Sequence, residues 1–194
     1  MKNRYYFFSD GLYWNTDSMS PSSYRCAYCG DHVTSEKGLR ITDLLYGGKG
    51  GVYICPNCSY PTYKYKDEQV PLPRYGETVK HLTGKIDKIY EEARDSFSVG
   101  AYTAVMLLCR KLLMHVAVDL GADENKNFIY YVNYFETEGY ISKNARPWVD
   151  KIRDLGNDAN HKILIGNRED AKKIINFSAM LLKTNYDYPG MIED

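Results

Sequence analysis

Two cysteine pairs, Cys26-Ala27-Tyr28-Cys29-Gly30 and Cys55-Pro56-Asn57-Cys58, decide how the front of this chain folds. Four thiolates form the commonest structural ligand set for Zn²⁺, and a C-x-x-C turn lets two sulfurs reach one ion while backbone N–H groups point at them. Gly30 permits a tight turn with positive φ after the first pair. The pattern predicts one structural Zn²⁺ on Cys26, Cys29, Cys55 and Cys58, with no open coordination position for catalysis.

Other chemistry is open to paired cysteines: two disulfides, a redox-active pair or an iron–sulfur cluster. A redox motif needs one pair in a thioredoxin-like βαβ context, and the sequence shows no such context. The fifth cysteine, Cys109, and the lack of a visible signal peptide weigh against disulfides. His32 lies close to the first pair, but we expect it outside the ligand set. Cys109 stands among apolar residues and is expected to be an inert buried thiol.

Short strands and turns are expected around the cysteines, as in a zinc ribbon. Gly47-Gly48-Lys49-Gly50-Gly51 suggests a hairpin tip, and the β-prone run 52–54 leads into Cys55. The N-terminal tyrosines are interpreted as packing around the metal. Ser20-Pro21-Ser22-Ser23 suggests a turn. Pro61, Pro71 and Pro73 suggest a linker, which places the domain boundary near residue 74.

Helical periodicity follows this boundary. Apolar residues recur every three or four positions from Val79 to Phe97, and again over about 101–119, where the helix is apolar nearly all round and is expected to be central. Further helices are predicted from Phe128 to about Glu138, from about Pro147, and after Asn167 until Tyr188-Pro189-Gly190. The predicted fold class is mainly α: a zinc-ribbon-like domain over 1–74, then a five-helix bundle over 75–194.

Charge and hydropathy exclude little. The 25 basic and 25 acidic residues give zero formal net charge, which provides no push toward nucleic acid or an anionic membrane. No stretch approaches the ~18 uncharged apolar residues of a membrane helix. A cytoplasmic location is the default expectation, and there paired cysteines more often hold metal than form disulfides.

A polar helix face is predicted within residues 151–161. On a helix, Arg153, Asn157 and His161 cluster opposite the apolar stripe that starts at Trp148. Histidine moves protons near neutral pH, and arginine stabilises growing phosphate charge, so these three are the candidate catalytic residues. The simpler interpretation, which these residues alone favour, is a solvated helix face.

Several segments resemble a known family. Gly100-Ala101-Tyr102, Arg110-Lys111-Leu112-Leu113, the run from Arg153 to His161, and Glu169-Asp170-Ala171 are similar to the domain of unknown function 4145, a branch of the HEPN superfamily. The resemblance implies a helical, frequently dimeric bundle, and active HEPN enzymes are metal-independent ribonucleases that use an Arg and a His from both protomers. Here seven residues separate Arg153 from His161, longer than the ribonuclease spacing.

Three functions follow as hypotheses. The first is a zinc-binding module that engages RNA, single-stranded nucleic acid or a partner protein, in an anti-phage defence context that the resemblance suggests. The second is a structural subunit that forms a homodimer. The third is a metal-independent endoribonuclease using Arg153, Asn157 and His161. Whether the chain is an enzyme is left open by the sequence.

Overall fold

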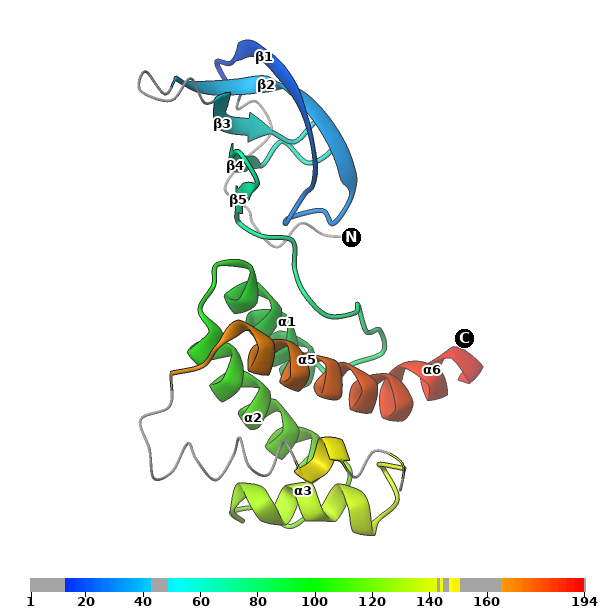
Figure 1. The fold of residues 1–194 in the computed structure, drawn as a ribbon. Coiled ribbons are helices and arrows are strands. Elements are labelled where there is room, and N and C mark those ends of the chain that lie inside the picture. The colour runs from blue at the N-terminus through cyan, green and yellow to red at the C-terminus, as the bar shows by residue number, and fades with distance from the viewer. Residues whose placement is uncertain (1–12, 43–48, 143, 145–146, 151–164, 194) are drawn as a thin grey trace. The chain divides into compact units, whose positions relative to one another are not determined.

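The structure is a computed structural model that describes residues 13–42, 49–142, 144, 147–150 and 165–193. It divides the chain into two compact units, one ending at Arg74 and the other beginning at Tyr75. Figure 1 shows strands in the first unit and helices in the second. Of the described residues, 47% are helical and 21% are in strands. The predicted class, a mainly α HEPN-like bundle behind a small ribbon, is therefore wrong, and the chain is a mixed α and β protein.

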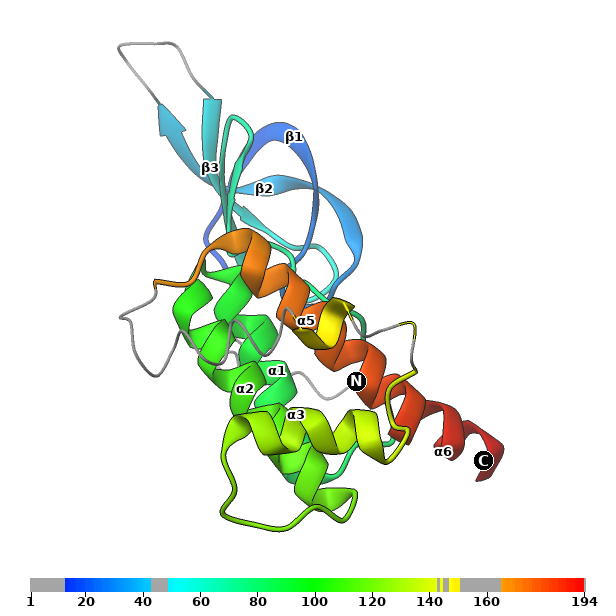
Figure 2. The same cartoon turned by 60° about the horizontal axis from the view of Figure 1, so that its bottom comes forward.

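The first unit is an antiparallel meander in which each strand pairs with the next, in the order β1-β2-β3-β4-β5. The strands are β1 Asp17–Arg25, β2 His32–Thr42, β3 Lys49–Ile54, β4 Pro61–Tyr65 and β5 Glu68–Val70. In Figure 1 and Figure 2 the long strands β1 and β2 curve together away from the shorter ones.

Two proline-containing segments are strands, although their composition predicted turns or linker. Pro61 is the first residue of β4, a position that needs no N–H for the ladder. Pro21 lies in edge strand β1, where the pairing register with β2 shifts between Ser18 and Ser22. A register shift of this kind leaves residues unpaired, so proline is tolerated there. The linker is consequently shorter than expected and begins after β5.

The second unit packs helices around α2. Its described elements are α1 Gly84–Ser98, α2 Tyr102–Asp119, α3 Phe128–Thr137, a helical stretch at 147–150, α5 Arg168–Leu182, a π-helical turn Lys183–Asp187 and α6 Tyr188–Glu193. Asn167 caps α5 as predicted, because its side chain accepts a hydrogen bond from the Asp170 N–H at 2.9 Å. The predicted stop at Tyr188 is wrong: the helix continues from α5 through the π-helical turn into α6, and Pro189 is the second residue of α6.

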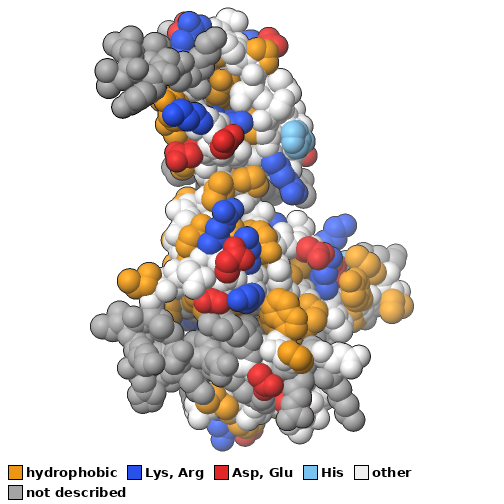
Figure 3. Space-filling model, in the orientation of Figure 1, with side chains coloured by type: hydrophobic (Ala, Val, Ile, Leu, Met, Phe, Trp, Pro, Cys, Tyr) orange, Lys and Arg blue, Asp and Glu red, His pale blue; other side chains and the backbone are white. Residues whose placement is uncertain are grey.

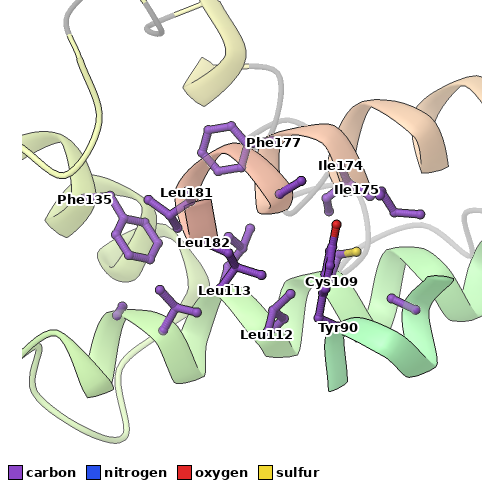
Figure 4. Packing of buried hydrophobic residues seen from close by; sticks show 14 of the residues in the cluster. Tyr90, Cys109, Leu112, Leu113, Phe135, Ile174, Ile175, Phe177, Leu181 and Leu182 are labelled. Atoms are coloured by element: carbon purple, nitrogen blue, oxygen red, sulfur yellow. The ribbon is translucent and has the colours of Figure 1, made fainter. Parts of the chain in front are cut away.

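The apolar core of this unit lies between α1, α2, α3 and α5. Figure 4 shows side chains from α2, α3 and α5 pointing toward one another, among them Leu113, Phe135 and Leu182, each at most 1% exposed. The entering segment is pinned to α1 by a buried arginine: the Arg94 Nε and Nη2 atoms donate to the carbonyls of Tyr75 and Gly76 at 3.1 Å. None of the described helices has the length and hydropathy needed to cross a membrane.

Candidate metal centre

The two cysteine pairs occupy turns with the same backbone hydrogen bonds. In the first turn the Gly30 N–H donates to the Cys26 carbonyl at 3.0 Å, and the Cys26 N–H donates to the Asp31 carbonyl at 2.9 Å. In the second turn the Ser59 N–H donates to the Cys55 carbonyl at 2.9 Å, and the Cys55 N–H donates to the Tyr60 carbonyl at 3.0 Å. We call the segments 26–31 and 55–60 the first and second knuckle.

The fourth position after the leading cysteine has positive φ in both knuckles. Gly30 has φ 80°, as its type predicts, and the equivalent Ser59 has φ 63°. Only glycine adopts this region without strain, so the second knuckle contains a local strain that the first avoids. The two turns connect β1 to β2 and β3 to β4, and the sheet thereby brings the four cysteines together.

The four sulfurs form a compact group. All lie within 4.8 Å of one another; the Cys26 and Cys58 sulfurs are 3.6 Å apart, and those of Cys29 and Cys55 are 3.8 Å apart. A tetrahedral ion with bonds of about 2.3 Å, such as zinc, places its sulfur ligands about 3.8 Å apart. A disulfide requires about 2.05 Å, and all four thiols are free. The geometry thus fits one four-coordinate metal ion.

The electrostatics of the group call for a cation. The pKa of Cys26 is lowered to about 5 because the Cys58 thiol donates to its sulfur and the N–H groups of Cys29 and Tyr28 point at it. The Cys58 thiol donates a hydrogen bond to the Cys26 sulfur, and this bond together with burial raises the pKa of Cys58. Burial raises the pKa of Cys29 to about 12. One thiolate therefore disfavours ionisation of the neighbouring thiols, and four thiolates coexist only around a positive ion.

Backbone N–H groups also lie toward two other sulfurs, in equivalent places. The Asp31 N–H interacts with the Cys29 sulfur, and the Tyr60 N–H interacts with the Cys58 sulfur. Both interactions lower the pKa of the thiol concerned and so favour the thiolate that a metal needs. Each knuckle thus supplies the second cysteine of its pair with a donor two residues downstream.

Side chains tie the knuckles to each other. The rings of Tyr28 and Tyr60 stack with centroids 4.7 Å apart, and Asn57 Nδ2 donates to Asp31 Oδ2 at 3.2 Å. Trp14 Nε1 donates to the Ser59 carbonyl at 2.8 Å. Stacked aromatics and cross-links of this kind hold the four sulfurs in register. They also give two of the N-terminal tyrosines the packing role that composition predicted.

Of the other candidate residues, the structure describes His32 and Cys109. His32 is exposed at the start of β2 and does not belong to the sulfur group. Cys109 is fully buried in α2, and burial raises the pKa of its thiol to about 12, as expected for an inert thiol. Arg153, Asn157 and His161 lie outside the described residues, so their catalytic assignment stays a prediction.

An exposed apolar surface on the sheet was not predicted. Leu39, Val52, Tyr63 and Val70 are successive partners across β2, β3, β4 and β5, so they form one row on one face of the sheet. We call these four residues the apolar row. Leu39 is 46% exposed and Val70 is 53% exposed. Successive residues of β3 and β4 point to opposite faces of the sheet, but only the register between strands shows that these four residues share one face.

A second row lies beside the first on the same face. Ile41, Gly50, Tyr65 and Glu68 are likewise successive partners, each two residues along its strand from a member of the apolar row. Ile41 is 40% exposed. The described part of this face is therefore apolar at its centre. Exposed charged residues lie at its margins, near the β4–β5 turn (Lys66 and Glu68) and at Lys37, two residues from Leu39 on β2.

Comparisons with known proteins concern the helical unit. One family, described as Domain of unknown function (DUF4145), matches residues 91–192, which is 102 of the 194 residues and more than half of the chain. Comparisons with curated proteins and with solved structures give no significant match. The match begins within α1 and leaves out the cysteine knuckles. On the strength of its helical unit, the chain belongs to the DUF4145 family.

Proposed function

We propose that the chain is a zinc-dependent protein-interaction module: a structural Zn²⁺ orders the sheet, and the apolar row of that sheet binds a second copy of the chain. The observation that carries the proposal is the register of the row, four exposed or half-exposed apolar side chains in one line across four strands. Contiguous apolar surface with a polar margin is typical of protein interfaces.

The metal is proposed to be zinc because four thiolates around one tetrahedral position are its commonest structural set. An iron–sulfur cluster would spread its thiolates over several irons, whereas these sulfurs all lie within 4.8 Å of one another. Elemental analysis of protein purified without added metal is expected to give one zinc per chain. One iron per chain, or no metal with reactive thiols, would contradict this assignment.

A second copy suits this face for two reasons. An apolar row is complementary to itself, as a two-fold interface requires. The chain carries 25 basic and 25 acidic residues, so two copies do not repel through net charge. At the margin, exposed Lys66 gives each copy a positive charge and exposed Asp67 and Glu68 give it negative charges, and a two-fold axis can set opposite signs against each other.

Single-stranded nucleic acid is less well suited to the same face. Two basic side chains of the sheet are already engaged with β1: Arg40 Nη2 donates to the Ser18 carbonyl at 2.7 Å, and Lys64 Nζ donates to the Ser23 carbonyl at 3.0 Å. Arg40 and Lys64 also alternate with the apolar row and so start from the opposite face. On the surface drawn in Figure 3, basic and acidic side chains are interspersed rather than gathered into one basic patch.

The test is the mass of the zinc-loaded protein in solution, measured by light scattering over about a hundredfold range of concentration. We expect a concentration-dependent dimer, which Leu39→Glu weakens about a hundredfold because each copy then buries an unpaired charge. Val99→Glu is the matched control, since Val99 is 64% exposed in the turn between α1 and α2, outside the sheet.

Two outcomes would overturn the proposal. One is a monomer at every concentration; the other is a dimer that Leu39→Glu leaves unchanged. A single-stranded oligonucleotide is titrated in parallel by fluorescence anisotropy. Binding by the monomer that Tyr63→Ala abolishes would assign the face to nucleic acid instead. Zinc content is measured on every variant, so loss of the metal is distinguishable from loss of the interface.

A further inference from the structure

The helical unit contains a cavity of about 1030 Å³ that the proposed function does not use. It is lined by one stripe of α2, by the start of α1, and by residues of the α2–α3 connection and α3. On α2 the lining residues recur every three or four positions along one side of the helix, and they are Leu107, Arg110, Lys111, Met114, His115, Val118 and Asp119. Cavities of this size and mixed lining are typical of sites for small organic molecules.

The cavity collects positive charge. Arg110, Lys111 and Lys85 line it, against the carboxylates of Asp119 and Glu124. The Asp119 carboxylate already accepts a hydrogen bond from the Tyr186 hydroxyl at 2.7 Å. Glu124 is exposed in the α2–α3 connection. Lys85 and Lys111 make no ion pair with the residues that the structure describes, so their charges are available to a ligand.

Arg110 is already engaged by its surroundings. Its guanidinium lies 4.7 Å from the centroid of the Phe128 ring, and burial lowers its pKa below the ordinary value. Asp119 follows Lys111 by eight residues, which is about 12 Å along a helix. An anion beside Lys111 therefore does not have to approach that carboxylate.

We propose that this cavity binds a small phosphomonoester with an apolar body. The phosphate group carries up to two negative charges and three acceptor oxygens, which matches the charges of Lys85 and Lys111. Met114, Val118 and the other apolar lining residues contact the body. A carboxylate carries only one charge and two oxygens, so it satisfies the same cations less completely.

Phenyl phosphate is the probe, titrated calorimetrically into the zinc-loaded full chain. We expect binding, with phenol, the same ring without the phosphate, at least about tenfold weaker because it lacks the charge. Lys111→Met and Lys85→Met are each expected to raise the dissociation constant about tenfold. Lys88→Met is the matched control: Lys88 is exposed on the same helix as Lys85 but does not line the cavity, and its loss is expected to leave binding unchanged.

Three results would contradict the binding of a phosphomonoester in this cavity. No heat with phenyl phosphate at about ten times the concentration that saturates a millimolar site would overturn the proposal. So would binding that Lys111→Met and Lys85→Met leave unaltered while circular dichroism shows both variants folded. Benzoate is run as a third ligand, and affinity equal to that of phenyl phosphate would replace the phosphomonoester with a carboxylate. None of these results depends on self-association through the sheet.

Discussion

The two units of this chain solve the same problem, ordering the backbone, by different means. The buried cluster of the described helical unit holds 25 residues, and only one of them, Cys109, is a cysteine. The corresponding cluster of the described sheet unit holds six, and two of these, Cys26 and Cys55, belong to the sulfur group. Burial of apolar surface can stabilise the first unit alone, whereas the second has too little of it. Metal binding can supply the free energy of folding that the sheet unit lacks.

Removing the metal should therefore break one unit and spare the other. Chelation of zinc is expected to unfold residues 13–74, with a loss of order 10 kcal/mol of binding free energy that is also folding free energy. The helical unit should keep its helical circular dichroism and its cooperative melting. Hydrogen exchange measured by peptide mass spectrometry localises the loss to the sheet.

Thiol labelling measures unfolding after chelation independently, through the exposure of the cysteines. After chelation, four of the five cysteines are expected to react with iodoacetamide, while Cys109 stays protected by its burial and its raised pKa of about 12. Labelling of all five thiols would show that the units unfold together. Protection of all five would show that the sheet persists without metal.

A substitution that leaves a cavity in the helical core should destabilise the helical unit and spare the sheet. Phe135 in α3 is 0% exposed, and Phe135→Ala is expected to lower the free energy of unfolding of the helical unit by about 3–5 kcal/mol. Zinc content and the exchange protection of the sheet should not change. Thr137→Ala, at an exposed position of the same helix, is the control and is expected to shift stability by less than about 0.5 kcal/mol. Loss of zinc from Phe135→Ala would contradict the independence of the two units.

The difference between the units also explains what the sequence could predict. Helical periodicity is local, so α2, α3 and the Asn167 cap of α5 lie close to where the pattern places them. The cysteine spacing predicted a metal group because ligand chemistry is specific to residue type. Neither inference needs knowledge of which distant residues meet.

Strand pairing is different because it depends on register between segments. Pro61 and Pro21 were weighed as local turn signals, and their strands were missed, although proline at a strand start or an irregular edge is tolerated. The apolar row was missed for the same reason, since Leu39 and Val70 are 31 positions apart in the chain. The strain at Ser59 had a signal: it stands where Gly30 stands after the first pair, and the comparison of the two motifs would have found it.

The smallest effect is expected within the metal centre, where the two knuckles differ at this one position. A side chain at Gly30 would meet no atom within 4 Å, so Gly30→Ser adds only the cost of positive φ, about 1 kcal/mol. Ser59→Gly removes that cost from the second knuckle, but glycine adds backbone entropy to the unfolded chain. We therefore expect its stability to rise by no more than about 0.5 kcal/mol.

Competition for zinc with a chromophoric chelator measures both substitutions, because stability of the knuckles appears as metal affinity. Gly30→Ser should weaken zinc binding about fivefold, and Ser59→Gly should leave it equal or slightly tighter. The double variant exchanges the two residue types between equivalent turns and should bind zinc between about two and five times more weakly than wild type, because the gain from Ser59→Gly offsets only part of the loss from Gly30→Ser. A double variant as weak as Gly30→Ser alone would mean that the second knuckle gains nothing from glycine. The stacking of Tyr28 on Tyr60 and the Trp14 contact to the Ser59 carbonyl would then be what holds that turn at positive φ.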